Sequence, residues 1–342
     1  MSFYNGNKLL SLKDLSRRDP EIFFCVGNRT AGKTFFFKRW MVRRFVKYGE
    51  RFVVFVRFID DLPSVAEGFW ADIGPLAFPG KWMTQAPLMH GKAAELLIDG
   101  ARCGYVIAIN DPERIKRNSA LFADAVRGFF DEFQSETGKY VSRETEKFNS
   151  IRLSIARGGA SGKHARYFPV YMCSNAVSVF NPYFDELGVA PRLQPGTRYL
   201  RGNGWVLEQT FNVSAAEAIT DNFKTLSDKE LQYATQNKYL RDDKRFVEDL
   251  PGAKTCIGII SRSGRDFGLW ETPSGIMWMS RKVNPGCTAR LVFFEEDHAP
   301  GSVLVTRGHP LSKMLREAYD KGAIRFDGGA ARNCLMTCLS YV

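Results

Sequence analysis

One eight-residue segment of the chain has the spacing of a phosphate-binding loop. Two glycines stand five positions apart, and the second is followed by lysine and threonine. Glycines let backbone N–H groups curl around the β-phosphate of a nucleotide. The lysine would bridge the β- and γ-phosphates, and the threonine hydroxyl would hold Mg²⁺. We therefore predict that ATP, with Mg²⁺, binds at Gly27, Asn28, Arg29, Thr30, Ala31, Gly32, Lys33 and Thr34.

Two adjacent acids supply the second half of a hydrolytic site. Asp131 and Glu132 follow Gly128-Phe129-Phe130, where a predicted strand ends. Asp131 would hold Mg²⁺ through water, and Glu132 would polarise the attacking water, which indicates a hydrolase rather than a kinase. Arg127-Gly128 interrupts the apolar run expected before such a pair. The alternative is a strand or helix end with two solvated acids.

The elements around the loop predict a parallel sheet. Residues 22–26 form a short apolar run that ends at Gly27, as a buried strand should. Residues 34–48 read as a helix closed by Gly49, and residues 51–58 as a second strand. A strand, a helix and a second strand within so short a segment make a βαβ unit, which implies a parallel sheet with helices on both faces. Further strands are predicted at 104–109, 128–130 and 168–173.

Composition narrows the class of protein. The chain has 342 residues, a net charge of +11 and a pI near 9.3, which favours a polyanionic partner such as nucleic acid, or else an evenly basic surface. The N-terminus does not have the pattern of a secretory signal, and no apolar run could span a bilayer. Seven scattered cysteines and four histidines show no ligand spacing, which argues against a zinc site and for reduced thiols in a cytosolic protein.

The pattern changes in the last third of the chain. Residues 214–246 are polar and helix-prone and are predicted to be a linker or lid. After Pro251, three short strands at 256–261, 267–271 and 276–280 are separated by tight-turn residues. A fourth strand at 289–295 and a helix at 311–321 complete a separate α/β domain. The predicted division is therefore 1–213, 214–246 and 247–342.

The segment from Met172 to Phe184 strongly resembles the DNA-packaging (encapsidation) ATPases of small podophages, the phi-twenty-nine-like Picovirinae. Matching residues recur in the same order at 45–52, 130–133, 267–270 and 325–327. The resemblance implies a P-loop domain of the additional-strand, catalytic-glutamate class. It implies a ring motor of five subunits that drives double-stranded DNA into a prohead at its portal vertex, with a packaging RNA as a further partner. The expected place is the host cytoplasm and, transiently, the prohead, but not the mature virion.

The same resemblance assigns roles to individual residues. Asn175 would be the sensor of the γ-phosphate, and Arg157 would be the arginine finger that enters a neighbouring subunit's site. Because residues 158–166 are longer and richer in glycine than the family pattern, Arg152 or Arg166 are alternatives for the finger. Lys116 or Arg117 would be a further cation at the subunit interface; the local alignment is ambiguous by a residue or two.

The loop after Glu132 would face the DNA in such a ring. It carries Lys139, Arg143 and Lys147, which would grip phosphates without reading sequence. Three glutamates are mixed in, so a plain surface loop is an equal alternative.

The last domain is predicted to be RNase H-like. Nucleases of that fold hold metal ions with clustered carboxylates. The expected first strand, 256–261, has none, and the only acidic cluster is Glu295-Glu296-Asp297. The domain is therefore predicted to lack nuclease activity, as the resemblance also implies. Two alternatives for the whole chain are a large terminase with an active nuclease and a DNA helicase or repair ATPase.

Overall fold

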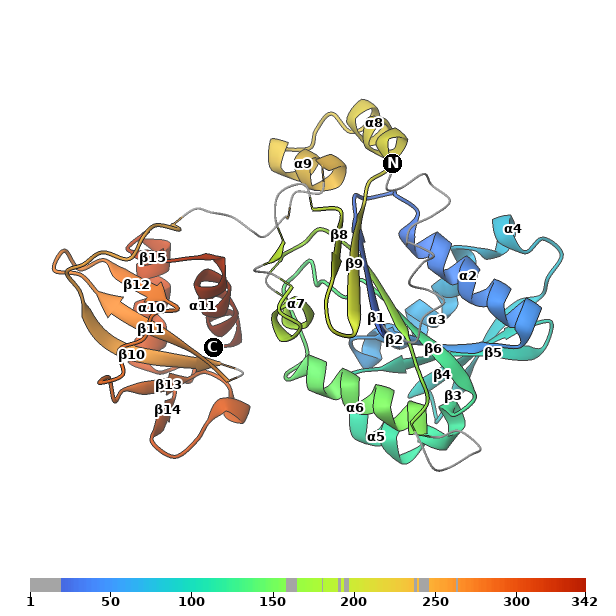
Figure 1. Ribbon diagram of the computed structural model, residues 1–342, viewed down its shortest axis with the longest axis horizontal. Coiled ribbons are helices and arrows are strands. Elements are labelled where there is room, and N and C mark those ends of the chain that lie inside the picture. The colour runs from blue at the N-terminus through green and yellow to red at the C-terminus, as the bar shows by residue number, and fades with distance from the viewer. Residues whose placement is uncertain are drawn as a thin grey trace. The chain divides into compact units, whose positions relative to one another are not determined.

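The protein divides into two compact units, residues 1–241 and 242–342 (Figure 1). A computed structural model describes residues 20–157, 165–179, 181–189, 192–193, 197–236, 239, 246–262 and 264–342. The boundary between the units falls inside the segment that we predicted to link them. Over the described ranges, no helix has the length and apolar character needed to cross a membrane.

The first unit is built on a nine-stranded sheet with the order β3-β4-β5-β2-β6-β7-β1-β9-β8. The six strands from β5 to β9 in that order run parallel, while β3, β4 and β8 are antiparallel to their neighbours. The predicted parallel sheet is confirmed, but its two antiparallel margins were not predicted. The strands are β1 (Ile22–Gly27), β2 (Arg51–Val56), β3 (Met83–Leu88), β4 (Ala93–Ile98), β5 (Ala101–Ala108), β6 (Ala125–Asp131), β7 (Val170–Asn175), β8 (Tyr199–Arg201) and β9 (Trp205–Thr210).

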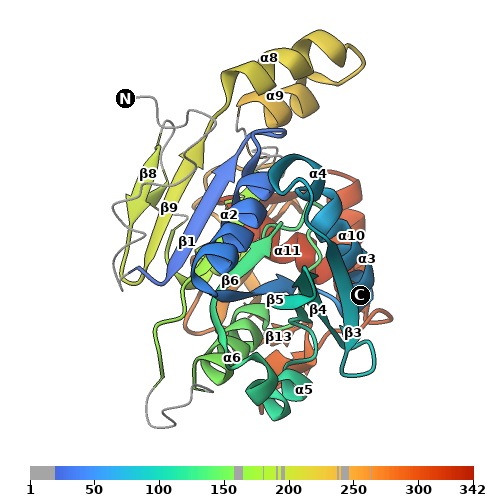
Figure 2. The ribbon, with the colours of Figure 1, turned by 90° about the vertical axis from the view of Figure 1, so that its right-hand side faces the viewer.

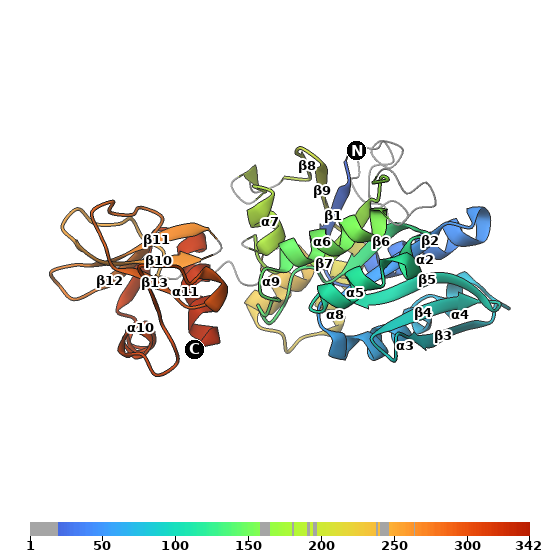
Figure 3. The same ribbon diagram turned by 90° about the horizontal axis from the view of Figure 1, so that it is seen from below.

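Helices cover both faces of this sheet, and the alternation of β1 explains the layering (Figures 2 and 3). Ile22 and Phe24 pack in the cluster that contains α6 and α7, whereas Phe23 and Cys25 pack in the cluster that contains α2 and α3. All six residues of β1 are buried, which is why the strand reads as one apolar run. The helices of the sheet layers are α2 (Lys33–Tyr48), α3 (Leu62–Ala71), α4 (Gly74–Ala77), α5 (Pro112–Arg117), α6 (Glu144–Arg157) and α7 (Pro182–Glu186), with 3₁₀ turns η1 (Ile59–Asp61) and η2 (Ser119–Phe122).

Strand β6 is longer than the predicted 128–130, and its two unusual residues are accommodated inside it. A Cβ at Gly128 would lie 2.5 Å from the ring of Phe55 on β2, so only glycine fits there. Arg127 pairs with Glu50, and its guanidinium lies 4.8 Å from the ring centre of Trp40. The charge is thus neutralised beside an aromatic face, and the strand continues to Asp131.

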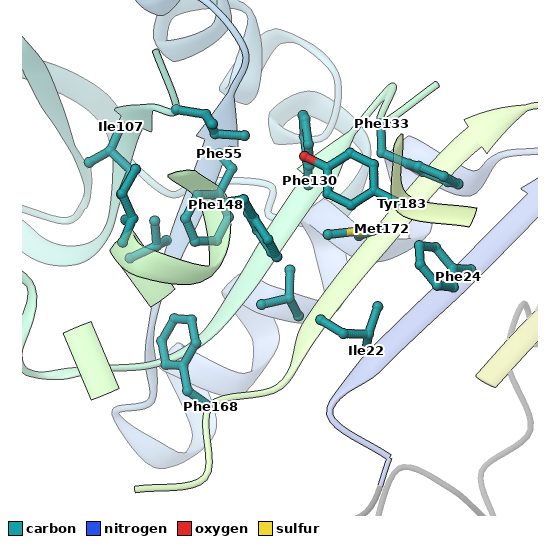
Figure 4. Close-up of a cluster of buried hydrophobic side chains, with 14 of the residues drawn as sticks. Ile22, Phe24, Phe55, Ile107, Phe130, Phe133, Phe148, Phe168, Met172 and Tyr183 are labelled. Atoms are coloured by element: carbon teal, nitrogen blue, oxygen red, sulfur yellow. The ribbon is translucent and has the colours of Figure 1, made fainter. Parts of the chain in front are cut away.

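A cluster of aromatic rings supports the loop that follows β6 (Figure 4). The ring of Tyr183 on α7 lies 5.9 Å from Phe130, 5.9 Å from Phe133 and 5.7 Å from Phe148, in edge-on geometry. Such pairs contribute about 0.5–1.5 kcal/mol each beyond their buried area. The floor beneath Asp131 and Glu132 is therefore closely packed.

The described part of the predicted linker contains two helices of the first unit, α8 (Val213–Asn222) and α9 (Asp228–Gln236). The side chain of Asn212 caps α8 by accepting from Ala215 N. Ser227 and Glu230 form a capping box at the start of α9. Residues 237–238 and 240–245 of the predicted segment lie outside the described ranges.

The second unit is a six-stranded sheet with the order β14-β13-β10-β11-β12-β15. β10, β11 and β12 form an antiparallel meander, and β13 and β14 add in parallel beside β10, as the predicted RNase H-like fold requires. β14, β15 and α11 were not predicted. The strand predicted at 289–295 is shorter and spans only Arg290–Val292, and Glu295 lies in a 3₁₀ turn. The elements are β10 (Thr255–Arg262), β11 (Arg265–Glu271), β12 (Met277–Ser280), β13 (Arg290–Val292), η4 (Glu295–Asp297), β14 (Ser302–Leu304), α10 (Pro310–Asp320), β15 (Ile324–Phe326) and α11 (Gly329–Tyr341).

Candidate active site

The phosphate loop joins the end of β1 to the start of α2. Gly32 has φ 82°, in the left-handed region that glycine adopts without strain, and it immediately precedes the helix. The side chain of Asn28 is buried and exchanges two hydrogen bonds with the backbone of Asn212. Of the residues predicted to bind nucleotide, Asn28 thus uses its side chain to anchor the loop to the start of α8. Its contribution to a phosphate would come from the backbone.

Lys33 occupies the centre of the loop. Its Nζ donates to Gly27 O at 3.2 Å, to Asn28 O at 2.8 Å and to Asn175 Oδ1 at 3.1 Å. Burial lowers the pKa of Lys33, and the neighbouring acidic groups partly offset this. The amino group is therefore held by three neutral oxygens and is well placed to exchange them for phosphate oxygens.

Thr34 and Asp131 lie side by side, although 97 positions separate them in the sequence. The hydroxyl of Thr34 donates to Asp131 Oδ2 at 2.7 Å. Asp131 Oδ1 accepts from Glu132 N at 3.0 Å and from Cys173 Sγ at 2.9 Å. Burial raises the pKa of Cys173 well above its usual value, so this thiol stays protonated and donates. Because Mg²⁺ prefers hard oxygen ligands, the Thr34 hydroxyl and the Asp131 carboxylate fit the ion that the sequence predicts.

Glu132 follows Asp131 in an unusual backbone conformation. Its φ is 52°, a left-handed value that residues other than glycine adopt at some cost and that is enriched at functional sites. Desolvation raises the pKa of Glu132, and the charges of Asp131 and Glu136 raise it further. A carboxyl group with a raised pKa is a better match for proton transfer near neutral pH.

A buried ion pair holds the backbone at Glu132, and sequence reasoning missed it. The guanidinium of Arg57, at the end of β2, donates to Phe133 O at 2.7 Å and to Glu132 O at 3.4 Å. The same guanidinium forms an ion pair with Glu144 at 2.9 Å. Glu144 lies at the start of α6, and its side chain is fully buried. Tyr183 OH also donates to Glu144, at 3.0 Å. Arg57, which directly follows the apolar run of residues 52–56, was the signal in the sequence.

Asn175, the residue that the resemblance assigns as a sensor, ends β7 and lies beside the phosphate loop. Its Oδ1 accepts from Lys33, and its Nδ2 donates to Glu136 at 3.4 Å. Because β7 is the neighbour of both β1 and β6, the carboxyl ends of these strands bring Asn175, Lys33 and Asp131 to one edge of the sheet.

The three candidate finger arginines lie at the other end of the sheet. Arg152 pairs with Glu21, directly before β1. Glu21 lies six positions before Gly27, the first residue of the loop, which is roughly 20 Å at about 3.3 Å per residue. Arg166 Nη2 donates to Ile155 O at 3.2 Å. Arg157 is exposed at the end of α6, and among the described residues its guanidinium has no ion-pair partner. Residues 158–164 of the predicted glycine-rich loop lie outside the described ranges.

The predicted DNA-facing cations occupy a loop and the helix after it. Lys139 is exposed in the loop, and Arg143 pairs with Glu146. Lys147 was predicted to lie in the loop as well. It lies instead on α6, one turn after Arg143, because Glu144 already begins the helix with its buried side chain.

The two candidate interface cations lie on α5. Lys116 pairs with Glu113 at 2.8 Å. Arg117 lines a shallow hollow together with His90, Asp111 and Leu121. This hollow is separate from the phosphate loop.

In the second unit, β10 carries no carboxylate along its length. Within the described residues of the chain, no three His, Cys, Asp or Glu side chains are grouped closely enough to hold a metal ion. Glu295 to Asp297 form the 3₁₀ turn η4.

The parallel sheet, the phosphate loop at its edge and the adjoining Asp131-Glu132 pair define the chain as a P-loop ATPase. The model of the podovirus DNA encapsidation protein family (Gp16) matches residues 1–339, and the chain belongs to this family.

Similar proteins share nearly the whole length. The DNA packaging protein of Bacillus phage phi29 is 23% identical over 337 residues, 97% of this chain and 95% of that protein. The DNA packaging protein of Bacillus phage B103 is 22% identical over 330 residues, 94% of this chain and 96% of that protein. A chain of the bacteriophage Phi-29 viral genome packaging motor assembly has the same fold, with a TM-score of 0.65 at 21% identity over 100% of this chain and 99% of that one. A chain of the Phi-28 gp11 DNA packaging motor also has this fold, with a TM-score of 0.62 at 16% identity over 98% of this chain and 99% of that one.

Proposed function

We propose that this chain is the ATP-hydrolysing subunit of a ring motor that drives double-stranded DNA into a prohead at the portal vertex. The observation that carries the proposal is the convergence of Lys33, Thr34, Asp131, Glu132 and Asn175 at one edge of the sheet, in a chain of the encapsidation family. Host cytoplasm and transient residence on the prohead follow from that role, as does absence from the mature virion.

Each of these side chains has a task in hydrolysis. Lys33 and the backbone of residues 27–32 hold the phosphates, and Thr34 and Asp131 hold Mg²⁺, which supplies positive charge against the phosphates when bound. Glu132 accepts a proton from the attacking water. Asn175, which contacts Lys33, is placed to respond to the γ-phosphate.

The partners follow from charge and family. Lys139, Arg143 and Lys147 offer phosphate contacts that carry no sequence information, which suits an engine that moves any DNA. The further partners are the portal and a packaging RNA, and the assembly is a homo-oligomeric ring, which we propose to be a pentamer. For the second unit we propose docking and DNA contact without nuclease activity, since β10 lacks the carboxylate that such a site needs.

Arg157 is the arginine that we propose to act on the neighbouring subunit. Its position at the sheet end remote from its own phosphate loop, free of an ion-pair partner within the described residues, supports a role between subunits. Arg157→Ala alone is expected to lower ATP turnover by about 10³-fold or more, the usual effect of an arginine finger. Mixing Arg157→Ala subunits with Lys33→Ala subunits should restore part of the hydrolysis, because some interfaces then join an intact loop to an intact finger. The same mixture with Arg152→Ala is the comparison, and absence of any rescue would contradict the assignment.

The direct test of the motor is DNA protection from nuclease. Matching proheads, DNA and this chain are incubated with ATP, with and without packaging RNA, and DNA is then digested. Protection that requires ATP and disappears in Lys33→Ala is the expected result. Strand separation on a forked duplex without protection would favour a helicase, and cutting of plasmid DNA by the full chain with Mg²⁺ or Mn²⁺ would favour a terminase with a working nuclease.

A further inference from the structure

One carboxylate oxygen at the mouth of the phosphate loop collects three hydrogen-bond donors. Glu136 lies in the loop after β6, and its Oε1 accepts from Arg29 Nη2 at 2.6 Å, from Tyr233 OH at 2.5 Å and from Asn175 Nδ2 at 3.4 Å. The donors come from the phosphate loop, from α9 and from the end of β7. Four stretches that are far apart in the sequence therefore meet at a single oxygen.

These contacts keep Glu136 an anion. Burial alone would raise the pKa of Glu136, but the hydrogen bond from Tyr233 and the charge of Arg29 outweigh it, and the pKa lies below its usual value. The Tyr233 side chain is buried, and its pKa is raised by that burial and by Glu136, so its hydroxyl stays a donor. An ionised oxygen that accepts from a guanidinium, an amide and a hydroxyl has the surroundings of a phosphate oxygen.

The same donors belong to the expected phosphate site. Asn175 accepts from Lys33 through Oδ1 while its Nδ2 donates to Glu136, so the Glu136 carboxylate is two hydrogen bonds away from the lysine amino group. A γ-phosphate held by Lys33 would require Asn175 and Arg29 for its own oxygens. Because both groups are anions, they cannot share these donors without repulsion.

Glu136 is also one of the contacts that tie α9 to the phosphate loop. Arg29 N donates to Ala234 O on α9 at 3.2 Å, and the Arg29 guanidinium lies 5.4 Å from the centre of the Tyr233 ring. The Tyr233 hydroxyl completes the connection through Glu136. Arg29 contributes to this connection through both its backbone and its side chain, and it is itself a residue of the predicted phosphate loop.

We propose that Glu136 determines how the site distinguishes a nucleoside triphosphate from a diphosphate. Its carboxylate takes the place of a γ-phosphate on Arg29 and Asn175. Only a bound γ-phosphate displaces it, which removes the contact between Tyr233 and Glu136 and loosens α9, while the backbone hydrogen bond from Arg29 to Ala234 stays. A diphosphate leaves Glu136 on its three donors and α9 attached. This inference rests on the proposed function, because it requires ATP at the loop.

Hydrogen exchange of the full chain tests the proposal with three ligand states: no nucleotide, ADP, and the non-hydrolysable ATP analogue AMP-PNP. The amides of α9 are expected to exchange about fivefold or more faster with AMP-PNP than with ADP, the lower range of coupling between two sites. In Glu136→Gln, which keeps the shape and removes the charge, these amides should exchange fast in all three states. The ratio of the AMP-PNP affinity to the ADP affinity should rise by a similar factor, because the competing anion is gone.

Two further variants complete the design. Tyr233→Phe keeps the ring and removes the hydroxyl, so it should also loosen α9 without nucleotide. It takes the place of Glu136→Gln in the test if that variant does not fold. Glu217→Gln, an exposed residue on α8, should behave as wild type. Equal α9 exchange with ADP and AMP-PNP in the wild-type chain, or unchanged α9 exchange in both Glu136→Gln and Tyr233→Phe, would overturn the proposal. If the wild-type chain binds no AMP-PNP at all, the proposed function itself is contradicted, whereas binding without a response in α9 contradicts only this inference.

Discussion

Glu132→Gln is expected to bind ATP with nearly wild-type affinity and to turn it over about 10²–10⁴-fold more slowly, the usual contribution of a positioned general base. The amide keeps the size of the side chain but cannot accept a proton from water. The backbone of this residue is held by Arg57, so the substitution should leave the surrounding loop in place. Equilibrium binding of labelled ATP and steady-state phosphate release measure the two effects separately.

The pH dependence of turnover gives an independent measure of the same role. Glu132 must be ionised to accept a proton, and its pKa is raised by desolvation and by Asp131 and Glu136. Turnover is therefore full above this raised pKa and falls as the pH drops through it, at a pH above the ordinary glutamate value of about 4.3. This acid limb should be missing from the residual activity of Glu132→Gln. Glu67→Gln, an exposed position on α3, is the control, and wild-type turnover in Glu132→Gln would contradict the base assignment.

Glu144→Ala is expected to destabilise the protein by about 3–5 kcal/mol, the cost of leaving a buried charge without its partner. The side chain of Glu144 is fully buried and that of Arg57 is only 10% exposed, so water cannot replace the missing carboxylate. Val141 N and Tyr183 OH would lose their acceptor as well. The shift of the urea midpoint, together with the denaturant slope, gives the change in the free energy of unfolding.

A double substitution separates the pair's net contribution from the penalty of breaking it. Arg57→Met with Glu144→Leu removes both charges and should recover much of the stability lost in Glu144→Ala, because apolar replacements of buried pairs are often neutral. Turnover of the double variant should be lower than that of the wild-type chain, since the guanidinium that donates to the carbonyls of Glu132 and Phe133 is gone. A loss below about 1 kcal/mol in Glu144→Ala, the range of exposed ion pairs, would show that the pair is not desolvated.

Features that depend on neighbours in the chain were predictable. The glycines, Lys33 and Thr34 lie within eight residues, and the buried strand before them is one apolar run. Strand, turn and helix are local structures, so their residues and spacing specify them directly. Asp131-Glu132 was recognisable for the same reason, and the resemblance pointed to Asn175. The turn-rich pattern after Pro251 likewise indicated the meander of the second unit.

The two margins of the sheet, and the strand β9 next to one of them, were harder to predict. β3 contains a proline and mixed polarity, and β9 includes Glu208 and Gln209, although both of these side chains are buried. Such strands lack a clear hydrophobic pattern in the sequence, because their stability comes from pairing with a neighbouring strand. β6 was shortened in the prediction at Arg127-Gly128, since only the packing of Phe55, Trp40 and Glu50 explains why those two residues belong in a strand.

By itself the sequence determined the chemistry at the phosphate loop and the class of fold around it, because those depend on short spacing and on periodic burial. The tertiary structure alone decided which distant residues serve that loop: Arg57 with Glu144, 87 positions apart, and Glu136 with Arg29, 107 positions apart. Both contacts form only after parallel strands align their carboxyl ends and α6 and α9 pack against them. The sequence around a single arginine or glutamate does not identify its partner, because the packing of strands and helices determines which side chains meet.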